Sequence, residues 1–239
     1  MARPRVVPNP INFRGSVPIP ISRNKVEIGA ETGATLVNPI EKKSRTRIEE
    51  KYEPLVFKEL FGNANPVEME IGCGKGKFLL DRALENPGTN FIGIDRIIKW
   101  MRRRKDRVER EAVPNIRFMR AEARVFLNEA VPPESVSIFH VYFPDPWPKR
   151  RHQTRRVMTA DFLRLLHSRL ARGGLLEVAT DHEDYYEAMK KTVAATAELW
   201  DNVRETRNER IVGGMNKTNY ELKFEAGGKP LFYMELAKK

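Results

Sequence analysis

Acidic side chains stand at or near the ends of several short apolar runs, where carboxylates could bind a small molecule. These residues are Glu70, Asp95, Glu122, Asp145 and Asp181. The carboxyl ends of parallel strands meet at one edge of a sheet, beside the crevice in which ligands bind. A carboxylate at such a position accepts hydrogen bonds from hydroxyl or amine groups. The pattern predicts an α/β sheet with a site for a polar ligand at that edge.

Three glycines at alternate positions, Gly72, Gly74 and Gly76, follow the first of these runs. Val67–Ile71 has the alternation of a short strand, and residues 77–84 have helical spacing. A strand, a glycine turn and a helix begin a nucleotide-type βαβ unit, in which glycine permits unusual backbone angles and close ligand approach. The glycine spacing is one residue shorter than in a dinucleotide fingerprint, and Glu70 would repel a pyrophosphate. The turn therefore resembles the first motif of class I S-adenosylmethionine methyltransferases, with a purely structural glycine turn as the alternative.

Two further strand ends carry acids suited to a nucleoside. Asp95 follows the predicted strand 90–94 and lies about twenty residues after the glycines, where a carboxylate commonly accepts both ribose hydroxyl protons. Glu122 follows the predicted strand 115–119 and could accept a bond from the exocyclic amine of an adenine. Either residue could instead cap the helix that follows it.

The most specific stretch follows the predicted strand 135–142 and reads Phe-Pro-Asp-Pro-Trp over residues 143–147. Prolines on both sides of Asp145 fix neighbouring φ angles and remove backbone donors, so its carboxylate is held stiffly at the strand end. A compact basic run follows at once: Lys149, Arg150, Arg151, His152, Arg155 and Arg156. We interpret this combination as a functional loop and not as a solvated one.

This stretch resembles the signature of the tRNA (guanine-N7-)-methyltransferase family. Residues 70–76, 93–95, 179–181 and 218–221 fit the family pattern in order, and the resemblance covers about residues 66–239. It implies transfer of a methyl group from S-adenosylmethionine to N7 of a guanine in the variable loop of tRNA. The cofactor-binding residues that it implies are Glu70, Gly72, Gly74, Asp95, Glu122 and Asp145, and Asp145 is also the expected catalytic residue. The implied substrate-binding residues are Lys149, Asp181, Thr218, Asn219, Tyr220 and Glu221, and those expected to contact RNA are Arg150, Arg151, His152, Arg155 and Arg156.

Composition agrees with a nucleic-acid partner. The chain has 239 residues and a net charge of +11, which favours RNA or DNA over a membrane. No apolar run reaches membrane-spanning length, and the single cysteine and four histidines have no metal-ligand spacing. We therefore expect a cytoplasmic protein without a metal, either a monomer or a homodimer.

The predicted architecture is a Rossmann-like, mostly parallel twisted sheet with an antiparallel C-terminal strand and helices on both faces. Residues 1–48 are expected to form a basic, proline-containing, flexible arm, and residues 49–239 the methyltransferase domain. Helices are predicted at 47–61 with a break at Pro54, and at 97–112, 159–171 and 183–199. Strands are predicted at 175–179, 218–224 and 231–236, although residues 218–221 taken alone could form an edge strand or a short helix. Thr180 and Glu183 have the spacing of a capping box.

Two other functions are compatible with parts of this pattern. An NAD-dependent oxidoreductase would share the strand-turn-helix opening, although the glycine spacing and Glu70 oppose it. A non-catalytic RNA-binding protein would explain the positive charge, but not the acidic residue at each expected strand end.

Overall fold

The computed structural model describes residues 36–37, 52–97, 107–108, 110–211 and 216–239. Its strands form one sheet in the order β1-β4-β3-β2-β5-β6-β8-β7. The strands are β1 (Leu36–Val37), β2 (Val67–Ile71), β3 (Asn90–Asp95), β4 (Ile116–Arg120), β5 (Val136–Tyr142), β6 (Leu170–Thr180), β7 (Trp200–Arg207) and β8 (Phe232–Lys238). Among these strands only β8 runs against the others, since it pairs antiparallel with both β6 and β7. The predicted Rossmann-like fold with an antiparallel C-terminal strand is confirmed.

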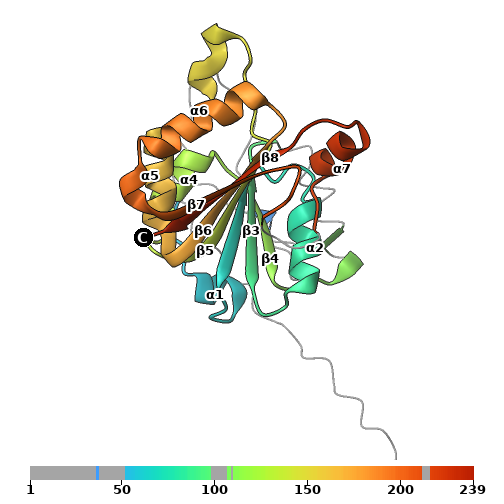
Figure 1. The fold of residues 1–239 in the computed structure, drawn as a ribbon. Helices are drawn as coiled ribbons and strands as arrows, with labels where there is room; N and C mark the ends of the chain where they lie inside the picture. The colour runs from blue at the N-terminus through green and yellow to red at the C-terminus, as the bar shows by residue number, and fades with distance from the viewer. Residues whose placement is uncertain (1–35, 38–51, 98–106, 109, 212–215) are drawn as a thin grey trace, which may run out of the picture.

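Helices cover both faces of the sheet (Figure 1). One layer holds α4 (Ala123–Glu129), α5 (Ala160–Arg169) and α6 (Glu183–Ala194), and the other holds α2 (Lys77–Glu85) and α7 (Asn219–Ala226). The shorter elements are α1 (Phe57–Phe61) and the 3₁₀ helices η2 (Arg150–Arg155) and η3 (Ala197–Leu199). A separate apolar cluster fills the space on each face of the sheet. Because both faces are buried, any charged side chain within a central strand must find a partner inside the protein.

One predicted helix at the N-terminal side, 47–61, differs from the structure. Residues 52–56 are not helical, and α1 begins only at Phe57. Proline disfavours helical angles in the residue before it, and the amide of Leu55 instead donates to the carbonyl of Ala130 at 2.8 Å. Residues 38–51 and most of the predicted helix 97–112 lie outside the described residues, although 107–108 and 110–111 are helical.

The predicted arm is not wholly separate from the domain. Leu36 and Val37 form β1, which pairs in parallel with β4 at the edge of the sheet. The other residues of the predicted arm lie outside the described part of the chain.

Differences also occur in the C-terminal half. The segment 218–224 forms the helix α7 and not the predicted strand, as the short-helix alternative for 218–221 allowed, because Thr218 and Glu221 form a capping box that starts a helix. The edge strand β7 was not predicted, and α6 ends at Ala194 instead of 199. The capping box expected at Thr180 and Glu183 does not form: His182 is the N-cap of α6, and the hydroxyl of Thr180 accepts its amide at 3.2 Å. The predicted helix 159–171 is α5, which already ends at Arg169, because the next residue, Leu170, pairs with Val136 in the sheet.

Candidate active site

The glycine turn has the backbone conformation that its spacing predicts. Gly72, Gly74 and Gly76 have φ angles of 79°, 49° and 72°, in the left-handed region that side chains disfavour. The amides of Gly72 and Cys73 both donate to the carbonyl of Ile94, at 2.8 and 3.1 Å, which ties the turn to the end of β3. Gly76 then begins α2, whose first amides point into the edge of the sheet where the strands end.

Asp95 lies at the end of β3, directly beside this turn. One carboxylate oxygen accepts the amide of Gly74 at 2.7 Å and the other accepts the amide of Ile97 at 2.7 Å. Asp95 and Glu70 are both buried, with exposed fractions of 8% and 5%. The structure thus brings two predicted cofactor-binding acids to the glycine turn, where Asp95 also holds the turn in shape. Its contact with a ribose stays a prediction.

Glu122 is the N-cap of α4. Its side chain accepts the amide of Val125 at 3.0 Å, so the helix-cap alternative is confirmed. The cap fixes the carboxylate at the end of β4, next in the sheet to the end of β3. Its predicted bond to an adenine amine stays a prediction.

The Asp145 loop, residues 143–147, leaves the end of β5 with two strained residues. Phe143 and Trp147 have φ angles of 50° and 43°, and each costs about 1–3 kcal/mol in a residue that is not glycine. Three contacts hold the strained loop. The amide of Phe143 donates to Ala179 at 2.7 Å, Arg156 Nε donates to the carbonyl of Pro146 at 2.8 Å, and the Arg155 guanidinium lies 4.9 Å from the centre of the Trp147 ring. The loop leaves Asp145 exposed at the edge of the sheet.

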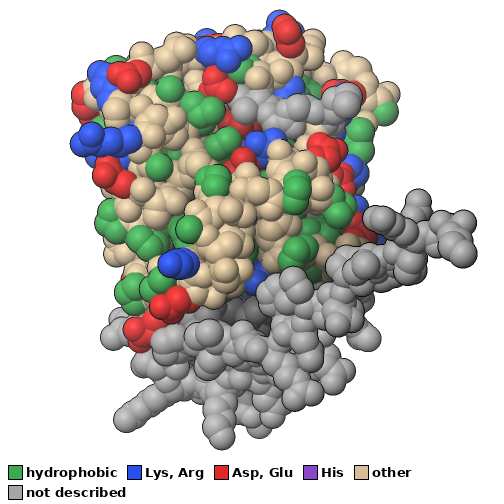
Figure 2. Space-filling model, turned by 90° about the horizontal axis from the view of Figure 1, so that it is seen from below, with side chains coloured by type: hydrophobic (Ala, Val, Ile, Leu, Met, Phe, Trp, Pro, Cys, Tyr) green, Lys and Arg blue, Asp and Glu red, His purple; other side chains and the backbone are tan. Residues whose placement is uncertain are grey.

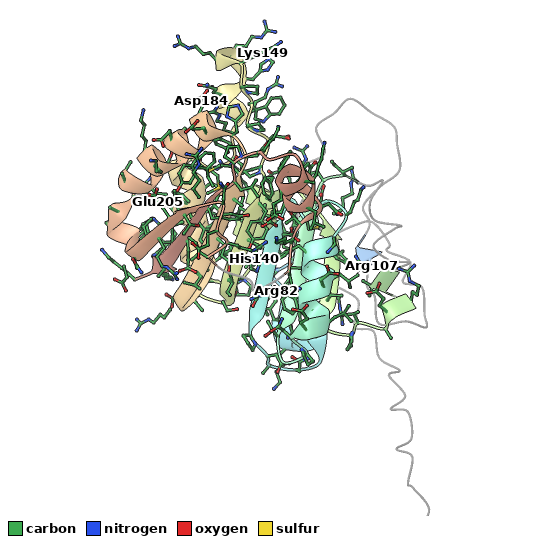
Figure 3. All side chains as sticks on the ribbon, turned by 45° about the vertical axis from the view of Figure 1, so that its right-hand side comes forward. Arg82, Arg107, His140, Lys149, Asp184 and Glu205 are labelled. Carbon is green, nitrogen blue, oxygen red and sulfur yellow. The ribbon has the colours of Figure 1, made fainter. Side chains whose placement is uncertain are left out.

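The basic run after this loop divides into an outer and an inner part. Lys149, Arg150, Arg151 and Arg155 are exposed, and the loop that carries them protrudes beyond the sheet, as Lys149 shows in Figure 3. His152 is half-buried and packs edge-on against Trp147. Arg156 points inward: besides its bond to Pro146, its guanidinium lies 4.6 Å from the centre of the Tyr185 ring. The geometry makes Arg156 a support of the Asp145 loop, a role that its sequence context did not predict.

The helix α7 brings a second group of predicted residues to the same place. Asn219 and Tyr220 are exposed, whereas Thr218 and Glu221 are buried. Tyr220 and Phe224 of α7 and Phe143 of the Asp145 loop form a cluster of three rings whose centres are 5.7–5.9 Å apart. This cluster joins two motifs that are about 75 residues apart in the sequence.

Glu221 has a different environment from the open ligand that the sequence predicted. Its two oxygens accept bonds from Arg210 Nη1 at 2.6 and 2.7 Å, from the Thr218 amide at 2.7 Å and from the Tyr233 hydroxyl at 3.1 Å. A carboxylate has about four lone-pair sites, so these bonds use its whole accepting capacity. The carboxylate is 1% exposed. In this structure Glu221 anchors α7 and does not face the solvent.

Asp181 follows β6 and completes the row of acids. Its carboxylate lies 3.6 Å from Lys229 Nζ, with exposed fractions of 22% and 57%. Lys229 also lies 5.0 Å from the centre of the Phe224 ring, so it links the end of β6 to α7. Ion pairs this exposed contribute about 0–1 kcal/mol to stability, so a ligand can displace Lys229 from Asp181 at little cost.

Comparison with known proteins identifies the family. The family model described as "Putative methyltransferase" matches residues 64–234. The tRNA (guanine-N(7)-)-methyltransferase of Geobacter metallireducens is 37% identical over 185 residues, which cover 77% of this chain and 88% of that protein. The chain belongs to this methyltransferase family. The tRNA (guanine-N(7)-)-methyltransferase of Bordetella pertussis is 42% identical over 132 residues, which cover 55% of this chain and 52% of that relative, so about half of that relative's length is matched.

Solved structures agree on the fold of this methyltransferase. An antibiotic-related methyltransferase superposes with a TM-score of 0.53 at 20% identity and covers 78% of this chain and 96% of its own. The 16S rRNA methyltransferase KamB superposes with a TM-score of 0.54 at 16% identity, covering 77% and 93%. At this identity the likeness establishes the fold alone. Within the described residues no helix is long and apolar enough to cross a membrane, and no group of His, Cys, Asp and Glu could hold a metal ion.

The methyltransferase also contains a buried charged network that the sequence analysis missed. His140 of β5 is fully buried between two carboxylates: its Nε2 lies 3.0 Å from Glu68 of β2, and its Nδ1 lies 3.2 Å from Glu177 of β6. Arg82 of α2 forms a two-bond ion pair with Glu68, and the Tyr142 hydroxyl donates to Glu177. Figure 3 shows Arg82 and His140 within the body of the protein, far from the protruding Lys149.

The pKa values in this network follow from its charges. Burial alone would lower the pKa of His140, but the Glu177 and Glu68 carboxylates more than offset it and raise this pKa to about 9. Burial alone would raise the pKa of Glu68, yet its bonds to His140 and Arg82 lower it to about 2. His140 is therefore a cation at neutral pH. One signal in the sequence could have revealed the network, namely charged residues inside three apolar strands that a parallel sheet buries on both faces.

Proposed function

We propose that this protein transfers the methyl group of S-adenosylmethionine to N7 of a guanine in tRNA, by family resemblance a guanine of the variable loop. The observation that carries the proposal is the contact of Phe143 with Tyr220 and Phe224, which joins the Asp145 loop to α7 at the edge that also holds the glycine turn. Two family motifs thus meet at the edge of the sheet that carries the glycine turn, in a chain that belongs to the family. Because the substrate is tRNA, we expect the protein to act in the cytoplasm.

We infer that the cofactor occupies the glycine turn. The left-handed backbone at Gly72 and Gly74 lets a bulky ligand approach the main chain, and Glu70 beside it suits the cationic or zwitterionic end of S-adenosylmethionine. Asp95 would hold the ribose hydroxyls and Glu122 the adenine amine. Asp145 lies two strands away from Asp95 along the same edge of the sheet. When bound, the cofactor supplies a methyl group on a sulfonium ion.

The protein's own contribution is mainly placement of the guanine. N7 carries a lone pair and no proton, so its attack on the methyl group needs no general base. Good orientation of two reactants can contribute roughly 7–11 kcal/mol to lowering a barrier. Asp145 and Asp181 would pair with the N–H groups of the guanine and stabilise the positive charge that methylation creates. Lys149, Thr218, Asn219 and Tyr220 would complete the substrate site, and Glu221 would act through the support that it gives to them.

The exposed cations of the protruding loop suit the tRNA backbone. Arg150, Arg151 and Arg155 point away from the core, and His152 lies among them. At the opposite end of the sheet, the side chains drawn in Figure 2 mix both signs of charge. A cationic protrusion beside the site would neutralise phosphates and orient the tRNA. Arg156, predicted with this group, would contribute through the Asp145 loop.

The test is methylation of unmodified bulk tRNA by the purified protein, followed by nucleoside analysis. We expect 7-methylguanosine to form only with S-adenosylmethionine present. Formation of a different methylated nucleoside would overturn the choice of guanine N7. Calorimetric titration with S-adenosylmethionine and with NAD separates the alternatives: binding of NAD alone would indicate an oxidoreductase, and binding of neither would indicate an RNA-binding protein without catalysis.

A further inference from the structure

The helix α7 has an unusual attachment to the rest of the protein. Within α7, all of whose residues the structure describes, Glu221 is the only buried side chain, while Tyr220 and Leu222 are 56% and 45% exposed. A surface helix ordinarily docks through an apolar stripe that faces the core. Here a buried carboxylate, together with the half-buried ring of Phe224, takes the place of that stripe.

Arg210 is the cation that balances this carboxylate. Arg210 Nη1 bonds to both oxygens of Glu221, and the two side chains are 10% and 1% exposed. The pair joins the chain just after β7 to the first turn of α7. Removing Arg210 would leave the buried Glu221 carboxylate without the cation that it pairs with.

The pair is anchored in turn by the buried charged network. The Arg210 guanidinium lies 4.8 Å from the centre of the Tyr142 ring and 5.0 Å from that of Phe78. Tyr142 donates to Glu177, and from there His140, Glu68 and Arg82 continue the network to α2. One set of contacts thus connects α7 with α2, the helix that follows the glycine turn. The set contains three carboxylates, two arginines and a histidine.

We propose that Arg210 is a positioning residue for methyl transfer, which holds Glu221 so that α7 presents Asn219 and Tyr220 beside the Asp145 loop. The proposal rests on the proposed function. Phe143 and Tyr220 are in ring contact, so a shift of α7 by an ångström would move the Tyr220 ring relative to Asp145. In this proposal Arg210 lies beneath the helix and acts through Glu221, without contacting the substrate or the cofactor itself.

The test compares Arg210→Gln with wild type in single-turnover methylation of tRNA, with the affinity for S-adenosylmethionine measured alongside. We expect the rate to fall roughly 10- to 100-fold, because small misplacements of reacting groups cost that much. The affinity for S-adenosylmethionine should stay within about twofold, since a loss of about 0.4 kcal/mol or less is expected where no cofactor contact changes. Arg204→Gln is the matched control: Arg204 pairs with Glu235 in the same part of the chain but is 56% exposed, and this variant should keep the wild-type rate.

A double-mutant comparison with Tyr220 tests whether Arg210 acts by positioning α7 or only by stabilising the fold. Tyr220→Ala should slow wild type, but it should add little in the Arg210→Gln background if Arg210 acts by placing Tyr220. Should Arg210→Gln fail to fold, the double variant Arg210→Gln with Glu221→Gln removes both buried charges and allows the same comparison. A wild-type rate in the folded variant, fully additive effects with Tyr220→Ala, or equal losses of rate and cofactor affinity would each overturn the proposal. If wild type itself does not methylate tRNA, the proposed function is wrong, and this outcome is distinct from an active wild type that tolerates Arg210→Gln.

Discussion

Asp145 and Glu221 are both acidic residues of family motifs, and they lie in segments that touch through Phe143 and Tyr220. Their surroundings differ completely. Asp145 is exposed on a strained loop between two prolines, whereas Glu221 is 1% exposed and makes four hydrogen bonds. The acidic residues of family motifs are thus of two kinds. Some are placed to contact a ligand, and others support the residues that do. Residue type alone does not separate the two kinds; burial and hydrogen-bond capacity do.

The largest expected effect is on stability, and it concerns Glu221. Glu221→Ala removes the carboxylate with which the largely buried Arg210 forms its ion pair, and breaking a buried ion pair costs about 3–5 kcal/mol. Asp145→Ala removes an exposed side chain and should change the free energy of unfolding by about 0.5 kcal/mol or less. Urea denaturation of both variants measures this contrast. Equal stabilities would mean that the two acids do not differ as their surroundings indicate.

The rate of methyl transfer is expected to depend strongly on Asp145, although the stability does not. Asp145→Asn keeps the size of the side chain but removes its charge and one acceptor, and losing one such group typically costs on the order of 10²–10³ in rate. Single-turnover methylation at saturating tRNA and cofactor, measured across pH, checks this. Because N7 has no proton to lose, the wild-type rate should show no titration of a catalytic base near neutral pH. A tenfold rise per pH unit that disappears in Asp145→Asn would instead identify Asp145 as a general base.

The buried charged network beneath α7 predicts a dependence of stability on pH. The pKa of His140 is raised from 6.5 to about 9 in the folded protein, so its contribution is fully present below about pH 6.5. It is lost as pH rises through about 9, and the total loss is about 3 kcal/mol. Chemical denaturation at pH 6.5, 8 and 9.5 measures how the free energy of unfolding changes over this range. His140→Gln should remove most of this dependence; an unchanged slope in that variant would assign it to other groups.

These contrasts also separate what the sequence could predict from what it could not. The strands from β2 to β6 were predicted because a parallel sheet buries both faces and leaves short apolar runs that end in turns. The glycine turn was predicted because glycine permits left-handed backbone angles, and the Asp145 loop because proline fixes its own φ angle. Asp95, Glu122 and Asp145 duly lie along one edge of the sheet.

The unpredicted parts depend on partners that are distant in the sequence. Glu68, His140 and Glu177 read as isolated polar residues until the sheet places them side by side on β2, β5 and β6. Residues 218–224 were predicted as a strand, with a short helix as the alternative for 218–221, and the capping box of Thr218 and Glu221 decides for the helix α7. The edge strand β7 lacks apolar alternation because most of its side chains are exposed. Arg156 could not be distinguished from the exposed arginines beside it by spacing alone.

A smaller effect is expected at the cofactor site. Asp95→Ala removes a charged acceptor from the two ribose hydroxyls, and a hydrogen bond to a charged group is worth about 1.5–3 kcal/mol. The variant also loses the bonds that Asp95 receives from Gly74 and Ile97, so Asp95→Asn, which keeps one acceptor oxygen, is the milder comparison. Isothermal calorimetry with S-adenosylmethionine measures both. A folded Asp95→Ala protein with wild-type affinity would remove Asp95 from the cofactor site.

The smallest effect per residue is expected on tRNA binding, in the exposed part of the basic run after the Asp145 loop. Arg150, Arg151 and Arg155 are open to phosphate, so replacing all three with alanine should weaken tRNA binding and flatten its dependence on salt. Each lost contact lowers the slope of log K against log salt by roughly 0.7–0.9. Binding titrations from low to moderate salt measure this slope, and the affinity for S-adenosylmethionine should stay unchanged.

Arg156→Ala is the half-buried counterpart of these exposed arginines. Since Arg156 Nε donates to the Pro146 carbonyl, that variant should keep the salt slope but slow methyl transfer. A triple variant with the wild-type slope would return the exposed arginines to ordinary solvated surface, and a reduced slope in Arg156→Ala would place that residue on the RNA.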